Sequence, residues 1–132
     1  MTGAAFFDTN VILYTTSADA AKAERAYQLL ERGGAVSVQV LNEIVRVLRG
    51  KNRLSWEAVD VILTGVRAAC SIHPMTITTH DVARRLSERY QLRIYDACIL
   101  AAAQLAGCDT LWSEDLQHGQ VVDGVTIRNP FV

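Results

Sequence analysis

Ala4-Ala5-Phe6-Phe7-Asp8-Thr9-Asn10 is the stretch that decides the fold of this 132-residue chain. A short apolar run that a polar turn ends abruptly is typical of a buried strand at the carboxyl edge of a parallel sheet. Such a sheet needs helices on both faces, so helices and strands should alternate along the rest of the chain. Asp8 would then lie directly beyond the end of the first strand.

The remaining sequence alternates in this way. Apolar residues at helical spacing predict five helices. The first covers residues 18–32, the second begins after a cap at Ser37 and ends at Gly50, and the third begins after a cap at Ser55. The fourth begins at Thr78 or Thr79, and the fifth extends from about Tyr95-Asp96 to Gly107. Strands are predicted at 35–38, 70–73, 110–112 and 125–127. The expected fold is α/β, a mainly parallel sheet in a three-layer α/β/α arrangement, and the length fits a single domain over residues 1–132.

Composition limits the class of protein. Half of the residues are hydrophobic and the formal net charge is −1, so any attraction to nucleic acid must come from a local basic patch. The three cysteines, Cys70, Cys98 and Cys108, form no C-x-x-C pair, which indicates a reducing compartment. Without a signal peptide pattern or an apolar run of about 20 residues, a soluble, cytoplasmic protein is expected.

Four acidic residues occupy related positions in this predicted topology. Asp8 follows the first strand, Asp115 follows the strand that ends at Trp112, Asp96 opens a helix, and Glu43 lies in the first turns of another helix. Ligands of open α/β sheets bind beyond the carboxyl ends of the strands. We therefore expect the four carboxylates to meet at one edge of the sheet.

A cluster of carboxylates raises its members' pKa values and opposes folding unless a cation binds there. Oxygen ligands without nearby thiolate or imidazole suit Mg²⁺ or Mn²⁺, which commonly organise phosphate chemistry. Taken singly, each acid also has an ordinary structural explanation. Asp8 and Asp96 could cap helices, Glu43 could be a solvated helix residue, and Asp115 could belong to a turn.

Four segments together resemble the motifs of PIN-domain nucleases. They are an apolar strand ending in Asp8-Thr9-Asn10, Leu41-Asn42-Glu43 after a helix cap, Asp96 leading an Ala-rich helix, and Trp112-Ser113-Glu114-Asp115. Their order and spacing extend over essentially the whole chain. The tail around 118–120 and 125–131 is similar to bacterial VapC-type members.

The resemblance implies a metal-binding, catalytic site made by Asp8, Glu43, Asp96 and Asp115, with supporting polar contacts from Asn10 and Ser113. It also implies a Mg²⁺- or Mn²⁺-dependent endoribonuclease, the toxin of a VapBC-type toxin–antitoxin pair. Its partners would be an RNA substrate, a cognate antitoxin that binds around the first two helices near Tyr14, Tyr27 and Leu30, and a second copy in a homodimer.

Basic and aromatic residues and histidines are further candidates for function. Arg46, Arg49, Lys51 and Arg53 form a basic stretch after Glu43, which could be a solvated face or, with Arg93, a rim that contacts RNA phosphates. His73, His80 and His118 lack a metal-ligand spacing. Trp56 and Trp112 are interpreted as core or interface residues.

Alternative functions remain open. A phosphohydrolase of the haloacid-dehalogenase type would need an acid at position 10, where the chain has Asn10, and a receiver domain would need a lysine after Lys51. Two alternatives keep the PIN fold: a housekeeping RNA-processing nuclease, and a degenerate binding module without catalysis.

Overall fold

The computed structural model describes residues 4–132. Its elements follow one another as β1 (Ala5–Phe7), α1 (Thr9–Leu13), η1 (Tyr14–Thr16), α2 (Ala20–Glu31), β2 (Gly34–Ser37), α3 (Val38–Gly50), α4 (Trp56–Ala69), β3 (Cys70–His73), α5 (Ile77–Tyr90), α6 (Ile94–Leu105), β4 (Thr110–Trp112), β5 (Val121–Val122) and β6 (Val125–Arg128). None of the helices in this range is long and apolar enough to cross a membrane.

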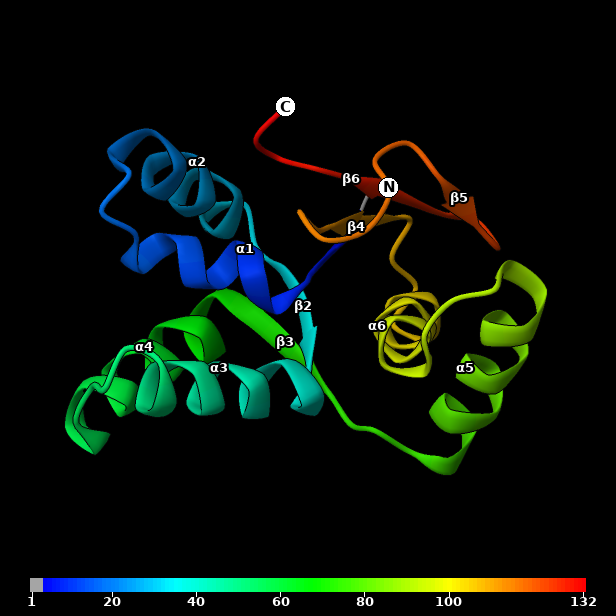
Figure 1. Cartoon of the computed structure of the whole chain (residues 1–132), viewed down its shortest axis with the longest axis horizontal. Helices are drawn as coiled ribbons and strands as arrows, with labels where there is room; N and C mark the ends of the chain where they lie inside the picture. Colours follow the sequence, from blue (N-terminus) through cyan, green and yellow to red (C-terminus); the bar gives the residue numbers. More distant parts are fainter. Residues whose placement is uncertain (1–3) are drawn as a thin grey trace.

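The described strands form one sheet in the order β3-β2-β1-β4-β6-β5. The pairs from β3 to β6 are parallel, and only β5 runs antiparallel, to β6. Helices α1 to α4 lie on one side of the sheet, and α5 and α6 lie on the other (Figure 1). This arrangement confirms the predicted three-layer α/β/α fold with a mainly parallel sheet.

Side-chain caps begin several helices where the sequence predicts them. The Ser37 hydroxyl accepts a hydrogen bond from the Val40 amide, and Ser55 caps α4 in the same way. The predicted start of α5 at Thr78 or Thr79 is late, because Thr76 is the cap and shares a capping box with Thr79.

The structure corrects three further predictions of where elements begin and end. Arg93, not Asp96, stands at the N-cap of α6, so Asp96 lies inside the first turn. Residues 9–13 form the short helix α1 where a turn was expected, and Val38 belongs to α3 instead of the preceding strand. The hairpin strand β5 was not predicted, because it contains only two residues. The Asp123-Gly124 pair, with positive φ at both positions, is a hairpin signal that could have revealed it.

The core fills both faces of the sheet. Phe6 and Phe7 are fully buried in β1, as is Leu111 in the neighbouring β4. Ala101, Ala102 and Ala103 are buried in α6, and their small side chains let this helix approach β2, β4 and β6 closely. The first turn of α6 is thereby held against the carboxyl edge of the sheet.

Gly34 provides a test of this close packing. A Cβ added there would lie 2.5 Å from the Phe7 ring and 2.6 Å from the Ala5 carbonyl oxygen. Gly34→Ala should therefore lower the free energy of unfolding by about 1–3 kcal/mol, as overpacked cores do. Gly65→Ala, in the open interior of α4, should raise it by roughly 0.5–1 kcal/mol. Urea denaturation measures both, and an unchanged midpoint for Gly34→Ala would contradict the packing.

Candidate functional site

Four elements bring the predicted acidic residues to one pocket at the carboxyl edge of the sheet. Asp8 follows β1, Asp115 follows β4, Glu43 lies in α3, and Asp96 lies in the first turn of α6. All four line the same pocket of about 330 Å³. Its remaining lining residues are Thr9, Asn10, Gln39, Tyr95 and Ile99.

Asp8 is the most enclosed of the four acids, and hydrogen bonds hold both of its carboxylate oxygens. Oδ1 accepts from the Thr9 amide at 2.8 Å, and Oδ2 accepts from the Ser113 hydroxyl at 2.8 Å. Burial raises the pKa of Asp8, these two hydrogen bonds lower it, and the nearby carboxylates of Asp115 and Asp96 raise it further. The net direction is upward. The site therefore carries an electrostatic strain that a bound cation would relieve.

Asn10 links two of the acids. Its Nδ2 donates to Asp8 Oδ2 at 3.2 Å and to Asp115 Oδ2 at 3.1 Å, while its Oδ1 accepts from the Glu114 amide at 3.0 Å. Ser113 completes the frame, because its buried hydroxyl also accepts from the Asp115 amide at 3.2 Å. Asn10 and Ser113 thus both form hydrogen bonds to Asp8 and Asp115.

Glu43 and Asp96 are held less tightly. The Glu43 carboxylate accepts from Arg46 Nη2 at 2.8 Å in a largely exposed ion pair. A contact of this kind is weak and easily exchanged, so Glu43 is free to turn toward the pocket. Asp96 is half-buried at the start of α6, where the positive end of the helix dipole favours a negative charge.

These acids fit a hydrated hard cation. Within residues 4–132, no three His, Cys, Asp or Glu side chains converge closely enough to form a ready-made ligand group. Mg²⁺ does not require one, because it usually keeps several waters and binds proteins through one or two carboxylates. The oxygen-only donors around the pocket, and the raised pKa of Asp8, are the features that suit such an ion.

The pocket also contains residues that the sequence analysis missed. Gln39 precedes Glu43 by one helical turn, and its Nε2 donates to the Tyr95 carbonyl at 3.5 Å across the pocket. The spacing of four residues on one helix would have revealed it. Tyr95 is largely exposed beside Asp96. Both can contact a substrate that enters the pocket.

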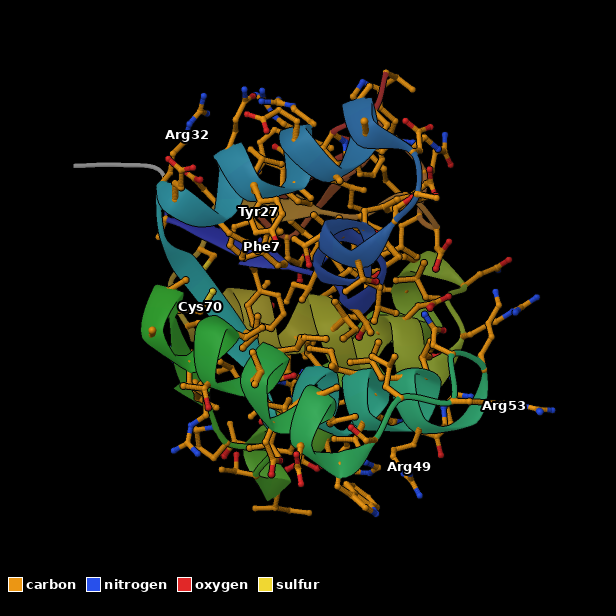
Figure 2. All side chains as sticks on the ribbon, turned by 90° about the vertical axis from the view of Figure 1, so that its left-hand side faces the viewer. Phe7, Tyr27, Arg32, Arg49, Arg53 and Cys70 are labelled. Atoms are coloured by element: carbon orange, nitrogen blue, oxygen red, sulfur yellow. The ribbon has the colours of Figure 1, made fainter. Side chains whose placement is uncertain are left out.

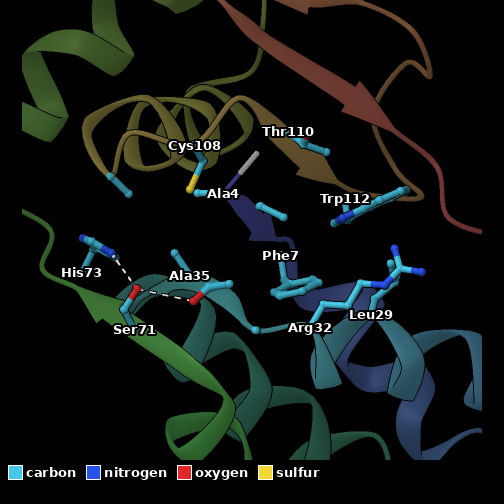
Figure 3. A pocket seen from close by; sticks show the side chains of 14 residues that line it. Ala4, Phe7, Leu29, Arg32, Ala35, Ser71, His73, Cys108, Thr110 and Trp112 are labelled. Atoms are coloured by element: carbon cyan, nitrogen blue, oxygen red, sulfur yellow. Dashed lines mark hydrogen bonds between the residues drawn. The ribbon is translucent and has the colours of Figure 1, made fainter. Parts of the chain in front are cut away.

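A wider cavity of about 520 Å³ lies elsewhere, and none of the four acids lines it (Figure 3). Ser71 and His73 point toward each other in it, with 3.0 Å between Oγ and Nε2. Phe7, Arg32 and Trp112 line the other end of the cavity. The four predicted acids therefore lie outside this cavity, around the smaller pocket.

The predicted basic residues separate into different surroundings. Arg46 pairs with Glu43, and Lys51 lines a second cavity that shares Asn10 with the acidic pocket. Arg49 packs over the Trp56 ring. Arg53 is exposed in the loop after α3, and Arg93 is exposed at the N-cap of α6. Trp56 is exposed and therefore not part of the core.

The profile of the PIN domain family matches residues 5–123. The chain belongs to the PIN domain family. No protein in the curated set matches the sequence significantly.

Solved structures share the fold of this PIN domain. A toxin–antitoxin complex from Klebsiella pneumoniae is 24% identical with a TM-score of 0.71, over 96% of this chain and 98% of that chain. VapC20 of Mycobacterium tuberculosis, a Sarcin-Ricin loop cleaving toxin, is 18% identical with a TM-score of 0.66, over 85% and 90% of the two chains. VapBC2 from Rickettsia felis, bound to a promoter DNA fragment, is 17% identical with a TM-score of 0.66, over 95% and 97%.

The fit to a cation predicts a thermal response to metal. A ligand that binds only the native state stabilises it by about 2.7 kcal/mol at a hundredfold excess over Kd, which should raise Tm by several degrees. Asp96→Asn removes one repelling charge, so in EDTA it should be at least as stable as the wild type. The same variant should lose most of the rise in Tm that Mn²⁺ induces. Melts of both proteins, each in EDTA and in Mn²⁺, measure this. An equal response in both would remove Asp96 from the site.

Proposed function

We propose that this PIN domain is a Mg²⁺- or Mn²⁺-dependent endoribonuclease and the toxin of a VapBC-type toxin–antitoxin pair. The observation that carries the proposal is the gathering of Asp8, Glu43, Asp96 and Asp115 from four elements around one pocket. Membership of the PIN domain family supports the nuclease assignment. The fold shared with toxins and toxin–antitoxin complexes supports the assignment as a toxin.

In this proposal the four acids would hold a hydrated divalent ion, one or two of them directly and the others through its waters, and the ion would supply a nucleophilic water at neutral pH and neutralise charge at the scissile phosphate. Asp8 is fixed by Ser113 and Thr9, so one carboxylate keeps a constant orientation. Asn10 sets the position of Asp115 relative to Asp8. Glu43 closes the α3 side of the pocket after leaving Arg46, which frees a guanidinium to contact the RNA backbone.

The proposed antitoxin surface begins at the same pocket. Asn10 lines both the acidic pocket and a second cavity of about 430 Å³ that contains Tyr14. Thr16 lines that cavity and also a third, mainly apolar one of about 330 Å³ between α2 and α4, which contains Tyr27 and Leu30. Residues expected to meet an antitoxin thus line a series of neighbouring cavities that share Asn10 and Thr16 and begin at the acids; we call this series the groove. A protein segment lying in this groove would block the pocket and bury apolar surface.

Cleavage tests the chemistry of the site. Purified protein with Mg²⁺ or Mn²⁺ should cut a structured RNA internally. Asp8→Asn and Asp96→Asn should each reduce the rate to the background level, because each loses a charged oxygen ligand while keeping the shape of the side chain. Circular dichroism should show that both variants remain folded. Full activity of either variant, or of the wild type in excess EDTA, would refute the mechanism.

The antitoxin groove is tested by growth. Expression of the wild type should arrest a bacterial host, and co-expression of the cognate antitoxin should restore growth. Val61 lines the apolar cavity and is 72% exposed, so Val61→Glu should fold normally but stay toxic in the presence of the antitoxin. Ile77→Glu, at a position that is 73% exposed on α5, is the matched control and should be neutralised. Harmless expression of the wild type would instead favour a housekeeping nuclease.

A further inference from the structure

Trp56 and Arg49 form an ordered pair on the surface between α3 and α4. Trp56 is 57% exposed, and the Arg49 guanidinium carbon lies 4.5 Å from the centroid of its ring. Arg49 Nη1 also donates to the Leu54 carbonyl at 3.0 Å. These two contacts fix the guanidinium on the indole, so the pair is held in place while much of the indole stays open to solvent.

The surroundings of this pair are basic although the whole chain has a net charge of −1. Arg46, Lys51 and Arg53 are all exposed, and Arg53 extends away from the body of the protein (Figure 2). The left-handed backbone of Arg53, with φ 55°, belongs to the loop that also positions Leu54. The acidic residues Glu57 and Asp60 lie on the α4 side, so a phosphate chain would follow the α3 side.

Helix α3 connects this surface to the acidic pocket. Glu43 lines the pocket, and Arg49 lies six residues further along the same helix, about 9 Å along its axis. Arg46 stands between them and touches Glu43. Glu43, Arg46 and Arg49 follow one another at intervals of three residues, so they form a ridge that winds part of the way around α3. An extended strand with a phosphate in the pocket would follow this ridge and then meet an exposed aromatic ring.

We propose that Trp56 and Arg49 are a stacking platform for a base of single-stranded RNA, a few nucleotides from the phosphate in the acidic pocket. The proposal rests on the proposed nuclease function. An indole stacks on any base, and neighbouring cations track the phosphates, which together make the usual site for single-stranded nucleic acid. The covering of the ring by Arg49 adds a planar cation on which a base can also stack.

The position of Trp56 on α4 favours RNA over the antitoxin as its partner. Gly65 lines the apolar groove and lies nine residues beyond Trp56, which is about two and a half helical turns. The two residues therefore face opposite sides of α4. A partner lying in the groove would leave the platform uncovered.

Binding of RNA without cleavage tests the platform. The full chain in EDTA is titrated into a fluorescently labelled single-stranded RNA of about ten nucleotides, and Kd is measured by anisotropy. Trp56→Ala should raise Kd roughly tenfold, and Trp56→Phe, which keeps a ring, should raise it less. Val121→Ala, at a position that is 56% exposed on β5, is the matched control and should leave Kd unchanged.

The dependence on salt separates stacking from charge. Arg53→Ala should lower the slope of log K against log salt by about 0.7, while Trp56→Ala should leave the slope unchanged. Duplex RNA of the same sequence should compete poorly with the labelled single strand for the platform, because the bases of a duplex are already stacked on one another.

Three results would overturn the platform. The first is an equal Kd for the wild type and Trp56→Ala, and the second is that the wild type does not bind single-stranded RNA. The third is that Trp56→Ala loses an oligomer that light scattering detects in the wild type, while its RNA binding is unchanged. The last would make Trp56 an interface between copies of the chain. The binding assay contains no metal, so its result does not depend on cleavage. If the protein binds RNA through Trp56 in EDTA but never cleaves RNA with Mg²⁺ or Mn²⁺, the nuclease proposal is refuted and the platform is supported.

Discussion

The parallel pairing of β1 with β4 is the contact on which the candidate site depends. It places the Asp8 amide 2.9 Å from the Trp112 carbonyl, and so brings the Ser113 hydroxyl to the Asp8 carboxylate across 105 residues of sequence. A carboxylate buried without donors would be costly, and the Ser113 hydroxyl and the Thr9 amide meet that requirement. The pocket therefore exists only once the first and fourth strands have joined.

The same geometry explains how the acids coexist. Asn10 stands between Asp8 and Asp115 and donates to both, which places a positive partial charge where the two carboxylates would otherwise repel each other. Arg46 neutralises Glu43 at the rim. These contacts place oxygen atoms around a pocket that suits an ion with its own waters.

The sequence predicted the features that depend on local chemistry. Strand-end acids and the Ser37 and Ser55 caps could be read directly, because each needs only its neighbours along the chain. The start of α6 could not be predicted in this way, because Arg93 is not a usual cap residue and packing of the Ala-rich helix decides where the helix begins.

Contacts between segments that are distant along the chain also could not be predicted from the sequence. Glu114 accepts hydrogen bonds from Tyr14 and Lys22, and Tyr14 packs edge-on against Phe131. These contacts follow from how the end of the chain lies against α2, which no periodicity reveals. The exposure of Trp56 is of the same kind, since an apolar residue at a helix start is usually assigned to the core.

The two proposed surfaces leave the acidic pocket in different directions, and this has a consequence for inhibition. The antitoxin groove runs past Asn10 and Thr16 toward the space between α2 and α4, whereas the RNA platform lies beyond Arg46 on the far side of α4. A partner in the groove would compete with RNA at the pocket and at Lys51, which lines the second cavity. Its affinity would then have to exceed what the pocket and Lys51 together contribute to RNA binding, because a base stacked at Trp56 and a phosphate at Arg53 would remain bound. Tight inhibition therefore requires a large apolar contact in the groove, and the mainly apolar cavity lined by Tyr27, Leu30 and Val61 is where the protein can provide it.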